Sequence, residues 1–167
     1  FGDDQSLIIG VTVDDVFTLE NLGLMQRISD RLESLKGVDY VTSLSTADHV
    51  QSVDDGVDIR PFLDPPPTSA ADAERVRAAV NGNPVYAGNL VSADSRTAAF
   101  IVYVDDTPEQ VFTDEGLDLR MLEAVEAEVQ GVPGAEVFMS GTAQMRSATS
   151  RVLRGDLAFM LPSVLGL

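Results

Sequence analysis

Histidine and cysteine are the side chains that most often perform catalysis or bind metals, and this sequence offers almost none of them. Its 167 residues include no cysteine and a single histidine, His49. Thiolate catalysis, disulfides and cysteine-bound zinc are therefore excluded, and so is a cluster of histidines around a metal. A catalytic triad would have to use His49, which lies in an expected loop. We therefore expect no catalytic residue and no enzyme activity.

Paired aspartates are the other residues with possible chemistry. Asp14-Asp15, Asp54-Asp55 and Asp105-Asp106 could supply oxygen ligands to Ca²⁺. However, residues 54–58 (DDGVD) do not have the spacing of an EF-hand loop. Residues 141–145 (GTAQM) match neither a nucleophile elbow nor a phosphate loop, and no G-x-G-x-x-G is present. We interpret the pairs as solvated loop carboxylates and expect no metal and no cofactor.

The charge of the chain limits its partners. The formal net charge is −16, from 27 acidic and 11 basic residues. Such a surface repels phosphates and anionic lipid head groups, so we expect no nucleic acid partner. Hydrophobic residues make up 44% of the chain, which is too many for a disordered protein and enough for one sizeable core.

One phrase occurs twice. VFTLENLGL at 16–24 returns as VFTDEGLDL at 111–119, with six of nine positions identical. Each copy follows a run that ends in Val-Asp-Asp. A common strand-to-helix turn could arise twice by chance, but order, spacing and strand character agree over some forty residues in each half. This agreement favours an internal duplication.

The first copy predicts a β-α-β unit. Residues 7–13 (LIIGVTV) form a continuous apolar run, typical of a strand that is buried on both faces. Thr18 is placed to cap a helix, Gly37 to end it, and residues 38–45 alternate as a half-exposed strand. The apolar stripe of the helix comprises Leu22, Met25, Ile28, Leu32 and Leu35.

The second copy repeats this plan. Residues 98–104 (AAFIVYV) are again a continuous apolar run, and Thr113 is the equivalent cap. Residues 131–134 break the helix, and residues 135–141 alternate as the returning strand. The helical stripe comprises Leu117, Met121 or Leu122, Val125 and Val129.

Two such units predict an α+β fold of the ferredoxin-like type. The continuous strands would be central, the alternating strands would form the edges, and one layer of helices would cover one face of the sheet. The two pseudo-repeats span residues 5–46 and 97–141. Aspartate in place of Ile9 or Ile101 is expected to unfold the protein, because each would bury an unpaired charge at a central strand.

Residues 47–96 belong to neither unit and form an insertion. Residues 52–69 are rich in Asp, Gly and Pro, which predicts an exposed irregular excursion. Ser69 precedes a short helix that ends at Asn81-Gly82. Residues 89–92 then resemble a short strand, and a turn at 93–96 would join it to the next strand as a hairpin. An insertion this large is usually functional or an interface.

The carboxyl end has a different composition. Residues 142–156 predict a connecting helix, and residues 157–167 (LAFMLPSVLGL, from Leu157) contain no charge. Eleven residues cannot span a bilayer, for which about 20 are needed. A core helix and the first part of a truncated membrane helix both remain open on this pattern.

Three segments carry a resemblance to a known family. They are NPVYAGNLVSADSRTAAFIVYV (83–104), LESLKGVDYVTSLST (32–46) and SGTAQMRSATSRVLRGDLAFMLP (140–162). In order and type they resemble the RND-superfamily transporters, most closely the MMPL-like, or hydrophobe/amphiphile efflux-3, branch. Ser95 departs from the family pattern, which often has glycine at this turn.

The resemblance implies an extracytoplasmic, or periplasmic, porter domain of a proton-driven exporter in the inner cell membrane. Residues 1–156 would form the domain and residues 157–167 the start of the next membrane helix. Its partners would be a hydrophobic or amphiphilic small molecule or lipid, a second porter domain of the same transporter, and the membrane through flanking helices. The coupling residues of the family lie in membrane helices outside this sequence.

An enclosed substrate path needs an apolar lining with few charges. The insertion offers Phe62, Leu63 and Tyr86 as candidates, and core packing is the alternative role for each. Two other functions also stay open. One is a soluble ferredoxin-like domain that binds a ligand or regulates, and the other is a membrane-anchored interaction domain that transports nothing.

Overall fold

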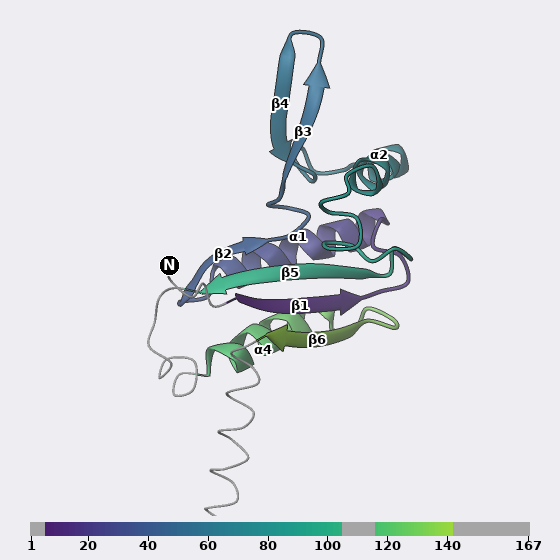
Figure 1. The fold of residues 1–167 in the computed structure, drawn as a ribbon. Helices are drawn as coiled ribbons and strands as arrows, with labels where there is room; N and C mark the ends of the chain where they lie inside the picture. The colour runs from purple at the N-terminus through teal and green to yellow at the C-terminus, as the bar shows by residue number, and fades with distance from the viewer. Residues whose placement is uncertain (1–5, 105–115, 142–167) are drawn as a thin grey trace, which may run out of the picture.

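The computed structural model describes residues 6–104 and 116–141, which form a mixed α+β fold (Figure 1). The two copies of the repeat lie on either side of an insertion that has helix and strands of its own. In chain order the elements are β1 (Ser6–Thr12), α1 (Leu19–Glu33), β2 (Val38–Thr42), β3 (Asp48–Val53), β4 (Gly56–Pro61), α2 (Ala70–Asn81), β5 (Thr97–Val104), α4 (Leu117–Val129) and β6 (Glu136–Gly141).

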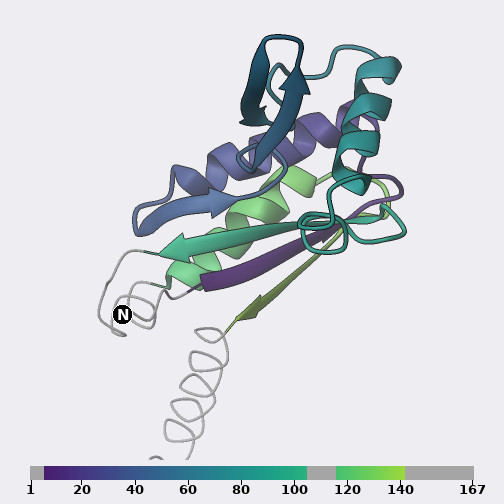
Figure 2. The ribbon, with the colours of Figure 1, turned by 45° about the horizontal axis from the view of Figure 1, so that its top comes forward.

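The main sheet has four strands in the order β2-β5-β1-β6, and every neighbouring pair is antiparallel. The two continuous apolar runs therefore provide the central strands, and the two alternating runs provide the edges, as the sequence predicted. Helices α1 and α4 lie side by side behind this sheet (Figures 1 and 2). This arrangement is compatible with a ferredoxin-like fold.

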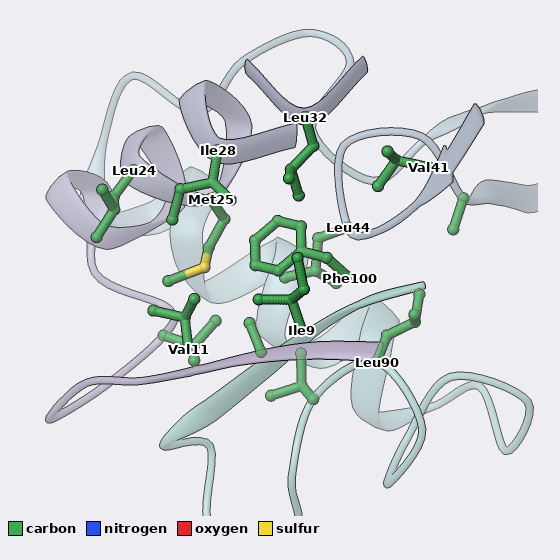
Figure 3. Packing of buried hydrophobic residues seen from close by; sticks show 14 of the residues in the cluster. Ile9, Val11, Leu24, Met25, Ile28, Leu32, Val41, Leu44, Leu90 and Phe100 are labelled. Atoms are coloured by element: carbon green, nitrogen blue, oxygen red, sulfur yellow. The ribbon is translucent and has the colours of Figure 1, made fainter. Parts of the chain in front are cut away.

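The core lies between the sheet and its helices (Figure 3). Ile9 of β1 and Phe100 of β5 are register partners, and both side chains are almost completely buried. Met25 and Ile28 of α1 pack against them from the helical layer. Burying each of these side chains contributes about 1.5–3 kcal/mol, so this layer supplies much of the stability of the fold.

The opposite face of the sheet corrects the prediction that the central strands are buried on both sides. Residues along β5 alternate between buried and half-buried, and Ile8 of β1 exposes 43% of its surface. A continuous apolar run is therefore not evidence here for two covered faces. Ile101 lies on the open face, so the expectation that Ile101→Asp would bury an unpaired charge in the core was wrong.

Aromatic side chains lie on this open face. Tyr40 and Tyr103 stack with ring centroids 4.2 Å apart. The ring of Phe138 covers Gly10, where an added Cβ would come within 1.9 Å of it. Gly10 therefore has a packing role, because any larger residue would displace this ring.

The starts of the two repeated helices differ. Thr18 caps α1 as predicted, since its side chain accepts a hydrogen bond from the Asn21 backbone N–H at 3.1 Å. Thr113 lies outside the described residues. Helix α4 begins at Leu117, and Gly116, with φ 59°, occupies its N-cap position without a side-chain hydrogen bond. The two copies of the repeat are thus more similar in sequence than in the local structure at the start of their helices.

The predicted helical stripes are confirmed, with one choice now made. In α4 the buried member is Met121, whereas Leu122 is half-buried. In α1 the helix ends at Glu33, so Leu35 follows it but still packs against the core. The buried residues of the two stripes are Leu22, Met25, Ile28 and Leu32 in α1, and Leu117, Met121 and Val125 in α4.

The prediction of an irregular excursion over 52–69 was wrong for residues 52–61 and is confirmed for residues 62–69, which contain no helix or strand. β3 and β4 pair in antiparallel register and form an arm that projects from the rest of the fold (Figure 1). Asp54 and Asp55 form the tip, and Gly56 follows with φ 148°. The two loop residues are therefore the aspartates, and Gly56 is the first residue of β4. An Asp-Gly dipeptide between alternating residues is a known hairpin signal, and it was available in the sequence at 55–56.

The other parts of the insertion largely follow the sequence. Ser69 caps α2 by accepting a hydrogen bond from the Asp72 backbone N–H at 3.1 Å, and the helix ends at Asn81. The predicted strand at 89–92 is reduced to an isolated antiparallel bridge between Val91 and Ala98. The expected hairpin is therefore limited to this bridge.

The predicted connecting helix and the uncharged segment, residues 142–156 and 157–167, lie outside the described residues. Over residues 6–104 and 116–141, no helix combines the length and the apolar character that crossing a membrane requires.

The two faces of the sheet predict unequal effects of the same substitution. Ile9→Ala should lower the free energy of unfolding by about 2–5 kcal/mol, because it opens a cavity in the core. Ile101→Ala should cost only about 1 kcal/mol, because its side chain lies on the open face. Urea denaturation of the two variants measures both values. Equal losses would contradict the one-sided core.

Candidate functional site

A cavity of about 510 Å³ lies between the arm, the proline-rich segment that follows it and helix α2. Its volume is within the range of small-molecule sites. It is built almost entirely by the insertion, so the duplicated scaffold supports it from outside. The lining residues are His49, Gln51, Arg60, Pro61, Phe62, Asp64, Pro65, Pro66, Pro67, Thr68, Asp72, Arg75, Val76 and Ala79.

Aromatic side chains form the inner end of the cavity. The rings of His49 and Phe62 stack with centroids 4.6 Å apart, and Tyr86 meets Phe62 edge-on at 5.2 Å. The Tyr86 hydroxyl donates a hydrogen bond of 2.9 Å to the Asp48 carbonyl oxygen. This contact ties the loop before β5 to the base of the arm.

The three predicted substrate-path residues therefore have different positions. Phe62 lines the cavity, although only 7% of its surface is exposed. Leu63 is buried in the core, and Tyr86 packs against the core behind Phe62. The structure thus brings Phe62 and Tyr86 together but gives Leu63 a packing role. The cavity residues from α2, Arg75 and Val76, were missed because their pattern is that of an ordinary amphipathic helix.

The charged residues of the cavity rim are mostly paired. The Thr68 backbone N–H, the hydroxyls of Ser69 and Thr68, and the nearby Arg75 all hold the pKa of the Asp72 carboxyl well below its usual range. Arg75 also forms an ion pair with Asp72. On the other wall, a hydrogen bond and the charge of Asp58 raise the pKa of Arg60.

His49 shows no arrangement suited to acid–base catalysis. It lies in β3 and not in the loop that the sequence predicted. Its Nδ1 atom is buried and has no hydrogen-bond partner within residues 6–104 and 116–141. In the same residues, no group of three or more His, Cys, Asp or Glu side chains is arranged to hold a metal ion.

Helix α2 is fixed to the first repeat by one arginine. Arg77 pairs with Asp15 at 2.7 Å and with Glu74 at 2.9 Å, and its guanidinium lies 4.9 Å from the ring centroid of Phe17. The hydrogen bond that Arg77 donates to the Asp15 carboxylate is the main reason that the pKa of Arg77 is raised. Helix α2, which forms one wall of the cavity, is thus held by Asp15 and Phe17 at the start of the first repeat.

This contact also changes the interpretation of the first aspartate pair. Asp15 accepts a hydrogen bond from the Phe17 backbone N–H at 3.0 Å and pairs with Arg77, so it is not merely a solvated loop carboxylate. Asp14 pairs with Arg96 at 3.7 Å and stays largely exposed. Both partners are distant in sequence, which is why the pattern alone did not indicate them.

Comparison of the sequence with models of known protein families gave no match, and comparison with curated proteins gave no relative.

The Arg77 contacts predict how firmly α2 is held. Arg77→Ala should lower the free energy of unfolding by about 1 kcal/mol, because it removes a half-buried ion pair and a cation–π contact between distant elements. Arg75→Ala is the matched control, because it places alanine in the same helix but removes only an exposed pair with Asp72. It should leave the free energy nearly unchanged. Equal effects in thermal denaturation would show that Arg77 does not anchor α2.

Proposed function

We propose that this chain is an extracytoplasmic porter domain of an RND-type, proton-driven exporter of hydrophobic or amphiphilic molecules. The domain would enclose its substrate together with a second domain of the same plan and release it as the two move. The enclosed molecule would be lipid-like, and the proton-coupling groups would lie in membrane helices that flank the domain.

The sheet order is the observation that carries the proposal. Two β-α-β units with their strands in the order β2-β5-β1-β6 are compatible with the split β-α-β arrangement of a ferredoxin-like fold, which is the architecture that the family resemblance implies. The large insertion falls between the two units and carries the cavity. A scaffold of this type serves many functions, so the site and the resemblance must supply the function.

The backbone at Ser95 adds independent support. Ser95 has φ 60°, the left-handed conformation that favours glycine. This is the position at which the resembled family often has glycine. Its N–H donates to the Ser92 carbonyl, and its own carbonyl accepts from the Val16 N–H, both at 2.8 Å. Ser95 therefore has the backbone conformation that glycine would favour, although the residue itself differs.

Two surfaces suit an apolar substrate or partner. The cavity offers Phe62, Val76 and a run of prolines. The open sheet face offers Ile8, Tyr40, Tyr103 and Phe138, and it carries no lysine or arginine on its strands. Aromatic residues on a sheet of this order could also stack nucleic acid bases, but binding would need cations for the phosphates. The charge of −16 argues against that partner.

The proposal is tested on the native gene and the membrane protein it encodes. We expect about 20 apolar residues on each side of the segment and a second domain of the same plan. Export of an amphiphilic dye from membrane vesicles should stop when the proton gradient is collapsed. A start codon just before Phe1 and a stop codon just after Leu167 would leave a soluble ferredoxin-like ligand-binding or regulatory domain. Flanking helices without gradient-driven export would leave an anchored interaction domain.

Ser95 gives a prediction on the isolated chain. Ser95→Gly should raise the free energy of unfolding by about 0.5–1 kcal/mol, because it relieves the left-handed conformation. Ala93→Gly in the same turn should lower it by a similar amount, because Ala93 does not have a positive φ and glycine only adds freedom to the unfolded chain. Chemical denaturation compares the two. A loss of stability in both variants would remove this support for the resemblance.

A further inference from the structure

We infer that the cavity between the arm and α2 selects amphiphiles with a cationic, ammonium-type head group. This inference rests on the proposed function and names the chemical class of its substrate. It depends on a cavity carboxylate that has no ion-pair or hydrogen-bond partner in the described part of the chain, on the local charge balance and on the apolar wall beside it.

Asp64 supplies a carboxylate without a close partner. It lines the cavity and is exposed, and its carboxylate makes no hydrogen bond or ion pair within residues 6–104 and 116–141. Its charge acts on Arg60 only at longer range, as the smallest contribution to the raised pKa of that arginine. The other charged groups are engaged, since Asp72 is bonded to Thr68 and Arg75, and Arg60 is bonded to Asp58. An incoming ammonium group can therefore pair with Asp64 without breaking an existing ion pair.

The charge balance favours the same sign of ligand. The lining carries Arg60 and Arg75 against Asp64 and Asp72, and Asp58 pairs with Arg60 from just outside it, so these five groups together sum to one negative charge. The whole chain adds a field from a net charge of −16. The local negative charge and the net charge of the chain both raise the local concentration of cations and repel anions. An anionic head group would have to displace Asp58 or Asp72 from an arginine.

The apolar walls accept the remainder of such a molecule. Phe62, Val76 and Ala79 lie at the inner side, and Pro65, Pro66 and Pro67 lie along the strap that joins the arm to α2. The stacked rings of His49 and Phe62 also line the cavity and extend this wall. A single alkyl chain can cover this wall while the head group stays at Asp64.

Three decyl compounds with the same chain test the inference: decyltrimethylammonium, decyl sulfate and decyl maltoside, each below its critical micelle concentration. They are titrated into the ¹⁵N-labelled 167-residue chain, and amide chemical shifts report affinity and location. We expect the cation to bind at least about threefold more tightly than the other two, with shifts at Phe62 and Val76. Rising salt should reduce this preference.

Asp64→Asn is the decisive variant. It should reduce the affinity for the cation about threefold while leaving decyl maltoside unchanged. Asp55→Asn is the matched control, because it removes the same charge from the tip of the arm, away from the cavity. It should leave the cation affinity nearly unchanged. Dispersed amide spectra establish that both variants are folded.

The remaining outcomes contradict the inference in distinguishable ways. Equal binding of all three compounds at the cavity would overturn the charge selection and leave the proposed function intact. Tighter binding of decyl sulfate would overturn it as well. Equal losses of cation affinity in Asp64→Asn and Asp55→Asn would mean that only the net charge of the chain attracts the cation. Shifts confined to Ile8 and Ile101 would move the site to the open sheet face, and no binding by any compound would also count against the cavity in the proposed function.

Discussion

The antiparallel pairing of β1 with β5 is the constraint on which the remaining structure depends. It joins residues 85 to 97 positions apart, from Thr12 opposite Thr97, where the two threonine hydroxyls are 3.0 Å apart, to Ser6 opposite Tyr103. Beside this central pair, β2 extends the sheet next to β5, and β6 extends it next to β1. The chain between β2 and β5 leaves the sheet and returns to it. Both ends of the insertion are therefore fixed by strands of the sheet.

One-sided burial follows from this sheet. Helices α1 and α4 cover one face, so Ile9 and Phe100 are sealed while Ile8 and Ile101 remain accessible. The open face carries aliphatic and aromatic side chains although the chain as a whole is strongly acidic. This face is largely apolar, with Glu136 of β6 as a charged residue at its margin. A largely apolar surface on an acidic protein is suited to contact with an apolar ligand or another domain. The ring of Phe138 covers Gly10 on this face.

The duplicated and unduplicated parts of the chain have separate roles. The two repeats provide a rigid scaffold, and the insertion provides the arm, helix α2 and the cavity between them. Function commonly lies in segments that a scaffold positions. Here the positioning depends on two contacts, Arg77 with Asp15 at one wall and Tyr86 with the base of the arm at the other. The first contact connects the insertion to the first repeat, and the second joins two parts of the insertion that are distant in sequence.

The sequence by itself determined the elements that depend on local periodicity. The central and edge strands, the stripes of α1 and α4, and the caps at Thr18 and Ser69 all follow from residues within a few positions of one another. The arm also had a local signal in the Asp-Gly dipeptide at 55–56. Tertiary structure alone decided which face of β1 and β5 stays open, because an apolar run is the same whichever side the helices cover. It also decided the cavity and the Arg77–Asp15 pair, since these need residues from distant segments to meet, and no local pattern encodes that distance.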